Sequence, residues 1–267
     1  MTPHPDAVAR AADRLEKAAA TTTPCVPVRD LIGTTDLAAA YAVQQTLVTR
    51  RLATGAVVTG RKIGLTSPAV QRQLGVDQPD FGVLFADMDV SGSATVSTAR
   101  LLQPKAEAEI AFVLGADLDA DDLDLASVRA VVDHATPALE IVDSRVADWD
   151  ITITDTIADN GSSGLYVLGE RTVPLAEFEP GEATMRLYAD GALASEGKGT
   201  DCLGDPLNAL LWLARTARDY GEPLRAGQVV LAGALGPMVS VSPGATVHAE
   251  ISGLGTVSAT FTDKEES

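Results

Sequence analysis

The sequence predicts an α+β fold, with a helical N-terminal portion followed by a larger unit built on a mixed sheet or barrel. Residues 5–20 and 36–53 carry apolar side chains at helical spacing. From residue 57 onward, short apolar runs alternate with Gly and Pro, at spacings that favour many strands over a strand–helix–strand repeat. We therefore expect a helical portion over residues 1–55 and a main domain over residues 56–267.

The helical portion has clear boundary signals. The helix expected over residues 36–53 can be capped by Thr35 or Asp36, and Gly55 is a stop signal. The connector TTTPCVPVRDLIGTT, which prolines interrupt, separates it from the helix expected over residues 5–20. Two helices joined by an irregular segment are therefore expected before the sheet begins.

The main domain opens with the strand VVTGRKIGLTS, a short helix in SPAVQRQLGV, and a loop and strand in DQPDFGVLFADM. Further strands are expected in the runs IAFVLG, ALEIVD, SGLYVLG, MRLYADG, QVVLAGAL and TVHAEISGLGTVSATF. The clearest helix is DPLNALLWLARTARDYG, in which Asp205 can serve as the N-cap and Pro206 stands in the first turn. We expect this helix to cover the open side of the sheet.

Composition excludes several classes of function. A formal net charge of −17 argues against binding nucleic acid or an anionic membrane surface, since both need clustered Lys and Arg. The N-terminus lacks the apolar core of a signal peptide, and no uncharged apolar stretch is long enough for a transmembrane helix. Cys25 and Cys202 are isolated, which makes a zinc site improbable. A cytoplasmic protein with reduced thiols is expected.

The most informative motif is a pair of glutamates inside an apolar run. Glu107 and Glu109 lie in QPKAEAEIAFVLG, and Glu140 lies in a second apolar run, PALEIVDSR. In a strand, residues two apart project from the same face, so Glu107 and Glu109 would lie side by side. Neighbouring carboxylates in apolar surroundings repel each other and resist desolvation, and a hard divalent cation relieves both costs. The three glutamates therefore predict a site for Mg²⁺ or Mn²⁺.

An alternative interpretation of the pair is the solvated face of a strand at a sheet edge. The run IAFVL that follows is typical of a strand buried on both faces. Leu139, Ile141 and Val142 give Glu140 a similar setting. This context favours the cation site.

Two further residues are candidates for proton transfer. Lys62, in GRKIGLTS, is a surface lysine, a cation held near an anionic substrate, or an acid/base whose pKa is lowered by a metal and burial. Asp80, in QPDFGVLF, is either an ordinary turn carboxylate or a general base. Because they lie in neighbouring segments, the two could form an acid/base pair.

The run DTIADNGSSG is dense in small polar groups. It is either a plain loop or a turn whose hydroxyl and N–H groups bind a carboxylate, with Asn160, Ser162 and Ser163 as candidates. Asp155 and Asp159 could orient metal ligands or waters from outside the ligand set.

Seven segments of the chain, in order, resemble the 2-keto-4-pentenoate hydratases of the fumarylacetoacetate hydrolase-like superfamily. They are GRKIGLTS, DQPDFGVLF, KAEAEIAFVL, ALEIVDSR, DTIADNGSSG, DPLNALLWLA and VLAGALGPMV, and the resemblance runs from about residue 28 to residue 262. It implies a mixed β-barrel-like core with a helical N-terminal portion, so residues 56–267 would form the catalytic domain. The 4-oxalocrotonate decarboxylases share this set of motifs.

The resemblance also implies roles for individual residues. Glu107, Glu109 and Glu140 would bind Mg²⁺ or Mn²⁺, and Lys62 and Asp80 would act as acid and base. Substrate contacts are implied for the following residues: Leu65, Asn160, Ser162 and Ser163. Asp205 departs from the His that many relatives carry before the helix, which an N-cap role accommodates.

The implied reaction is the addition of water to a 2-hydroxy-2,4-dienoate, giving a 4-hydroxy-2-oxo acid in the meta-cleavage degradation of aromatic or steroid compounds. Decarboxylation of 2-oxo-3-hexenedioate is the alternative, and a non-catalytic partner subunit of a hydratase–decarboxylase complex is a third hypothesis. Cleavage of acylpyruvates is disfavoured, because the stretch ADNGSSG lacks the lysine used in that chemistry. The resemblance further implies a homo-oligomer, with a downstream aldolase or a paralogous decarboxylase as a partner.

Overall fold

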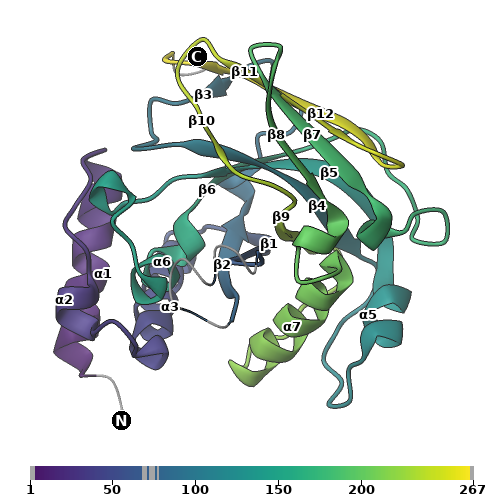
Figure 1. Ribbon diagram of the computed structural model, residues 1–267. Coiled ribbons are helices and arrows are strands. Elements are labelled where there is room, and N and C mark those ends of the chain that lie inside the picture. The colour runs from purple at the N-terminus through teal and green to yellow at the C-terminus, as the bar shows by residue number, and fades with distance from the viewer. Residues whose placement is uncertain (1–3, 68–70, 72–75, 77, 265–267) are drawn as a thin grey trace.

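The structure is a computed structural model that describes residues 4–67, 71, 76 and 78–264, and two β-sheets form its centre (Figure 1). The larger sheet has seven strands in the order β2-β1-β9-β4-β5-β6, with β10 paired to β4. Its strands are β1 (Val58–Gly64), β2 (Asp80–Phe85), β4 (Lys105–Leu114), β5 (Val132–Val142), β6 (Ser163–Leu168), β9 (Val229–Ala234) and β10 (Val239–Ser240). Only the β1–β9 pair of this sheet is parallel, so the sheet is mixed, as the sequence predicts.

The second sheet has five strands in the order β3-β12-β11-β7-β8 and lies above the first in Figure 1. Its strands are β3 (Val96–Ser97), β7 (Thr184–Ala189), β8 (Ala192–Lys198), β11 (Thr246–Ile251) and β12 (Gly255–Thr262). Strands β11 and β12 pack against β5. Because β5 belongs to the larger sheet, the two sheets share a buried boundary.

Three helices form the N-terminal portion: α1 (Pro5–Ala20), α2 (Arg29–Ile32) and α3 (Leu37–Ala53). The side chain of Asp36 caps α3 by accepting a hydrogen bond from the N–H of Ala39, and Gly55 follows with a φ of 92°. Both predicted helices are confirmed. The sequence did not indicate α2, since four residues are too few for a helical period to show.

In the described part of the chain, further helices pack against strands of the larger sheet: α5 (Leu125–Val131) on β5, α6 (Ile153–Ala158) on β2 and α7 (Pro206–Asp219) on β9. The 3₁₀ turns described are η1 (Ala86–Met88), η2 (Ala147–Trp149), η3 (Asn160–Ser162), η4 (Pro180–Glu182) and η5 (Gly199–Asp201). Asp205 caps α7 by accepting from the N–H of Leu207, and the helix packs against α5 and β9. The expected cap and the expected cover of the sheet are therefore both present.

One apolar core joins the helical portion to the sheets. It contains Leu15 of α1 and Val43 of α3 together with Ile110 of β4 and Ile141 of β5. Burial of such side chains contributes roughly 1.5–3 kcal/mol each, so the helices are held by packing and not by propensity alone. The division at residue 55 stays a prediction.

A single buried carboxylate also ties the N-terminal portion to α6. Asp155 accepts hydrogen bonds from the N–H groups of Val28 and Arg29, both at 2.9 Å, and from the Arg29 guanidinium at 2.8 Å. Its second oxygen also accepts from the N–H and hydroxyl of Thr152, which begins α6. The residue that anchors the α2 segment therefore lies 127 positions further along the sequence than Val28.

The short helix expected in SPAVQRQLGV and the charged end of the chain lie largely outside the described residues. Within the described residues, every helix is too short or too polar to cross a membrane.

Replacement of Asp155 by alanine is predicted to destabilise the protein by about 3 kcal/mol, because it leaves buried donors without an acceptor. Asp36→Ala, which removes only a helix cap, is the matched control and should cost about 1 kcal/mol. Urea unfolding followed by circular dichroism measures both free energies. Equal losses in the two variants would contradict the anchoring role of Asp155.

Candidate metal centre

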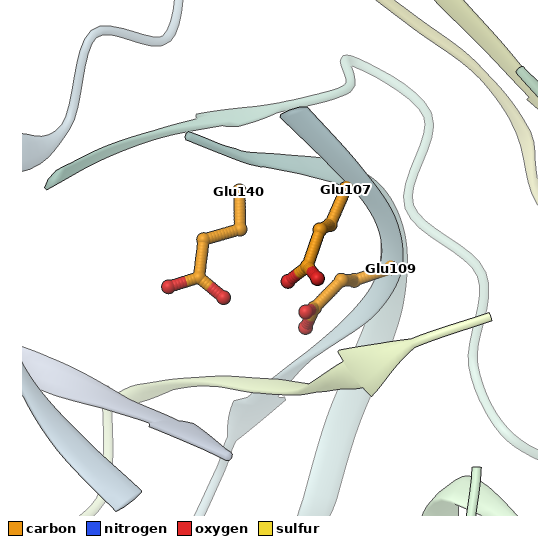
Figure 2. Close-up of side chains that lie close together, drawn as sticks. All are labelled: Glu107, Glu109 and Glu140. Carbon is orange, nitrogen blue, oxygen red and sulfur yellow. The ribbon is translucent and has the colours of Figure 1, made fainter. Parts of the chain in front are cut away.

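Three glutamates meet on one face of the larger sheet (Figure 2). Glu107 and Glu109 project from β4, and Glu140 projects from the adjacent strand β5. The antiparallel register places Glu107 directly opposite Glu140. Each residue offers a carboxylate oxygen, and these oxygens lie within 4.8 Å of one another.

Strand alternation explains this arrangement. Ala106, Ala108 and Ile110 point to the opposite face and are fully buried in the main apolar core. Packing in that core determines which face of β4 carries the apolar side chains, because a slip of one residue along the strand would exchange the two faces. Glu107 and Glu109 are therefore driven to the same side, as the spacing predicts.

The carboxylates lack the partners that buried charges require. Glu109 and Glu140 are both 0 % exposed. The N–H of Gly233 donates to Glu109 Oε2 at 2.8 Å, but Glu109 Oε1 and both oxygens of Glu140 accept no hydrogen bond from the described residues. Buried polar atoms are almost always paired, so these oxygens mark a place for a ligand.

Burial raises the pKa values of all three glutamates, and neighbouring carboxylates add to the rise. Burial raises the pKa of Glu107 to about 7, with Lys62 opposing the shift and Glu140 adding to it. The pKa of Glu109 lies well above its ordinary value, because burial and the charges of Glu140 and Glu107 act together. Burial also raises the pKa of Glu140, against the effect of Lys62. The site stores unfavourable charge that a cation would relieve.

These features fit a hard divalent cation. The donors are carboxylate oxygens only, which suits Mg²⁺ or Mn²⁺ and disfavours metals that prefer sulfur or imidazole ligands. One carboxylate oxygen of each glutamate lies within 4.8 Å of the others, a spacing that one ion can share. Glu107, Glu109 and Glu140 would hold it.

Lys62 lies at the edge of the same cluster. It is on β1, its side chain is 3 % exposed, and its Nζ lies 3.0 Å from Glu140 Oε1. This distance makes an ion pair, although the angles do not meet hydrogen-bond geometry. Burial alone would lower the pKa of Lys62, but the charges of Glu140, Glu107 and Asp80 reverse this and raise it. Lys62 therefore stays cationic.

Asp80 begins β2, directly opposite Gly64 of β1. A side chain at Gly64 would meet Asp80 Oδ1 at 2.2 Å, so glycine is required there to admit the carboxylate. Asp80 is buried, its Oδ1 accepts no hydrogen bond from the described residues, and burial raises its pKa. A carboxylate with one free oxygen and a raised pKa is suited to exchanging a proton.

Thr156 of α6 connects Asp80 to Ser162, a role that sequence reasoning missed. Its hydroxyl donates to Asp80 Oδ2 at 3.2 Å and lies 3.3 Å from Ser162 Oγ. The residue belongs to the run DTIADNGSSG, but a threonine inside a helix is usually only a helix residue. Only the fold brings it to Asp80.

The η3 turn gives Ser162 its position. Asn160, Gly161 and Ser162 all have left-handed backbone angles, with φ between 53° and 63°. A side chain at Gly161 would meet Lys62 at 2.9 Å, so the turn packs directly on that lysine. Strained backbone of this kind persists where surrounding contacts enforce it and is concentrated at functional sites.

Asn160 and Ser163 have structural contacts of their own. The Asn160 amide accepts from the N–H of Val83 and donates to its carbonyl, which locks the turn onto β2. Ser163 Oγ donates to the carbonyl of Asn160. Leu65, which follows β1, is also left-handed, with a φ of 56°. Substrate contacts from these three residues stay predictions.

Asp155 and Asp159 are engaged elsewhere. Asp155 anchors the N-terminal segment, as described above, and Asp159 forms an ion pair with Arg145. Burial raises the pKa of Asp159 to about 6, with Arg145 opposing the shift. Their hydrogen bonds go to the scaffold behind the η3 turn and not to the glutamates.

Fold and site together define a member of the fumarylacetoacetate hydrolase family. The model described as "Fumarylacetoacetate (FAA) hydrolase C-terminal" matches residues 61–262, and the chain belongs to this family. It is 54 % identical to the TodF product hydratase of Pseudomonas putida F1. That match spans 255 residues, which are 96 % of this chain and 95 % of that protein. The chain is 50 % identical to the 2-keto-4-pentenoate hydratase of Burkholderia vietnamiensis, over 97 % of this chain and 98 % of that one.

A solved structure shares the whole fold. It is the 4-oxalocrotonate decarboxylase of Pseudomonas putida G7, complexed with magnesium and adipate, with a TM-score of 0.92 and 31 % identity. The match covers 97 % of this chain and 98 % of that one. The predicted fold class is confirmed.

Mn²⁺ is predicted to raise the thermal unfolding midpoint at pH 8 and to do so much less at pH 5.5. Below about pH 7, Glu107 takes up a proton that it must release before it binds the ion. Differential scanning fluorimetry with and without Mn²⁺ measures the shift. Glu107→Gln and Glu140→Gln should abolish it at both pH values, whereas Glu196→Gln, on an exposed strand, should leave it intact. A shift that persists in Glu140→Gln would refute the assigned ligand set.

Proposed function

We propose that the protein is a metal-dependent hydratase that adds water to 2-hydroxypenta-2,4-dienoate or a homologue. The product is 4-hydroxy-2-oxopentanoate or a longer 4-hydroxy-2-oxo acid, as in the meta-cleavage degradation of aromatic compounds. The observation that carries the proposal is the convergence of three glutamates with Lys62 and Asp80 in one largely buried cluster. The choice of hydration as the reaction is supported by hydratases that are 50 % and 54 % identical to this chain over nearly its full length.

When bound, Mg²⁺ or Mn²⁺ would act as a Lewis acid toward a 2-oxo acid and stabilise negative charge on its C2 oxygen. The protein's own residues supply the remaining requirements. The glutamates would hold the ion in a fixed position, and the burial of Glu109 and Glu140 limits the access of bulk water to it.

Asp80 is the proton carrier of the proposal. Its free Oδ1 can accept the proton of the C2 hydroxyl as the dienol becomes a ketone, and C5 gains a proton in the same conversion. The resulting 3-enoate is electrophilic at C4. A water then adds its oxygen to C4, and a proton is delivered to C3, so the overall change is the addition of one water.

Lys62 supplies fixed positive charge. It is buried against Glu140 and remains protonated, so it favours states in which negative charge grows near it. It also offsets the repulsion among the carboxylates while a substrate anion enters.

The Thr156–Ser162 pair sets the direction of the hydrogen bonds. Thr156 has one hydroxyl proton, and it donates this to Asp80. The 3.3 Å contact between the two hydroxyls then has Ser162 as the donor and Thr156 as the acceptor. Ser162 Oγ keeps free lone pairs, which can accept a hydrogen bond from the attacking water.

Decarboxylation of 2-oxo-3-hexenedioate is the second candidate. The solved decarboxylase with magnesium and adipate has the same fold at 31 % identity, which is lower than the identity to the hydratases. A non-catalytic partner subunit is less well supported, because such a subunit has no need to retain the buried cluster.

The same proposal includes association into a homo-oligomer, contact with an aldolase or decarboxylase, and a cytoplasmic location. The two free cysteines support the last of these.

Purified protein is predicted to consume 2-hydroxypenta-2,4-dienoate in the presence of Mg²⁺ and to form 4-hydroxy-2-oxopentanoate. Loss of the dienol absorbance gives the rate, and mass spectrometry identifies the product. Removal of the metal with a chelator should abolish turnover, and readdition should restore it. Release of carbon dioxide from 2-oxo-3-hexenedioate, with no hydration of the pentadienoate, would replace the proposal by its alternative.

Asp80→Asn is predicted to lower kcat by about 10²–10⁴-fold, since it removes a general base but keeps the shape of the side chain. Thr156→Val, which keeps the carboxylate and removes only its hydroxyl donor, should lower kcat less and shift the pH–rate profile. Thr46→Val, at an exterior helix position where the hydroxyl bonds its own backbone, is the control and should have no effect. Full activity in Asp80→Asn would exclude this residue as the base.

A further inference from the structure

Lys105 lies beside the metal centre, and the proposed function gives it no role. It begins β4 two residues before Glu107, so strand alternation places it on the same face as Glu107 and Glu109. The register agrees, because Lys105 is opposite Val142 and Glu107 is opposite Glu140. The positive charge of Lys105 opposes the rise in the pKa of Glu107, as expected for a neighbour on that face.

Accessibility along this face indicates how the centre is reached. Glu109 is fully buried, whereas Glu107 and Lys105 are only half-buried. Solvent contact therefore increases from Glu109 toward the beginning of β4. A ligand that approaches along this face meets Lys105 before it meets the deepest glutamate.

Trp149 fixes the position of this lysine. The Lys105 Nζ lies 4.3 Å from the centre of the Trp149 ring, a cation–π contact. The indole N–H donates to the carbonyl of Gln103 at 3.1 Å, and Gln103 Oε1 accepts from the N–H of Asp148. The ring is thus tied to the residues that precede β4.

The backbone at Trp149 is strained. Asp148 and Trp149 are consecutive left-handed residues, with φ values of 58° and 55°. Neither is glycine, so surrounding contacts must enforce this conformation. The molecule therefore maintains an unfavourable turn whose result is an aromatic face under Lys105.

The charge of Lys105 is not matched by a carboxylate. No described residue forms an ion pair or hydrogen bond with its Nζ, in a chain with a net charge of −17. Lys62 differs in this respect, because Glu140 already neutralises it. An aromatic face positions an ammonium group without neutralising it, so the N–H donors that point away from the ring remain available.

We propose that Lys105, held by Trp149, binds a carboxylate group of the substrate at the entrance to the metal centre. The inference rests on the proposed function, since it takes the ligand to be a 2-oxo acid. The carboxylate is either the one next to the 2-oxo group or a second one at the far end of a dicarboxylate. An acidic protein has to overcome its own field to admit such an anion, and an unpaired cation on the approach does so.

Binding of two probes to Mn²⁺-loaded protein tests this inference. The probes are 2-oxobutanoate, which has one carboxylate, and 2-oxoadipate, which adds a second at the far end. Isothermal titration calorimetry on Lys105→Gln should show dissociation constants about 10- to 100-fold above the wild-type values, as expected for loss of a charged hydrogen bond. Lys105→Arg should recover most of the affinity. Equal weakening of both probes assigns the carboxylate next to the 2-oxo group, and weakening of 2-oxoadipate alone assigns the distal one.

Controls separate a binding role from a structural one. Lys105→Gln should still bind Mn²⁺, and its thermal unfolding midpoint without metal should stay near the wild-type value. Trp149→Leu, which removes the ring, should weaken the probes in the same direction and by a smaller factor. Unchanged affinity of Lys105→Gln for both probes would overturn the inference and leave the proposed function standing. Wild-type protein that binds neither probe in the presence of Mn²⁺ would overturn both.

Discussion

The repulsion among three carboxylates held inside an apolar sheet is the constraint on which the rest of the structure depends. Carboxylate oxygens of Glu107, Glu109 and Glu140 lie within 4.8 Å of one another, closer than the distance of about 8 Å over which physiological salt screens charges, and two of the three residues are fully buried. Folding has to supply the free energy that holds them there. It comes from the opposite face of the same strands, where alanine, isoleucine and leucine side chains are buried in the main apolar core.

Residues around the cluster offset the negative charge of the carboxylates and place further polar groups beside them. Gly233 donates one hydrogen bond to Glu109, and Lys62 places one positive charge against Glu140. Gly64 admits Asp80, and the left-handed η3 turn brings Ser162 to Thr156. The left-handed η3 turn is a local departure from ideal geometry, and buried charge is a second kind of departure. A stable fold can carry several such departures when they lie at one site and the remaining core is regular.

The sequence predicted the features that depend on near neighbours and missed those that depend on distant ones. The shared face of Glu107 and Glu109 follows from a spacing of two, and the caps at Asp36 and Asp205 follow from adjacent residues. The opposition of Glu107 and Glu140 depends on strand register, which spacing does not fix. The contact of Asp155 with Val28 spans 127 residues, so no local pattern indicates it, and only the resemblance linked the glutamates to Lys62 and Asp80.

The two lysines of the centre show how one charge type can meet two different demands. Lys62 is buried and paired, so its charge is largely cancelled before an anion comes near, and it acts only on groups in contact with the cluster. Lys105 stands nearer to solvent on an aromatic ring, where its charge remains open to a ligand. The opposite arrangement would serve neither purpose. A buried lysine without an ionic partner tends to lose its proton, and a surface lysine that is already paired attracts an anionic ligand only weakly. The acidic composition of the chain makes this separation necessary, because an anionic substrate can enter only where positive charge is left uncompensated.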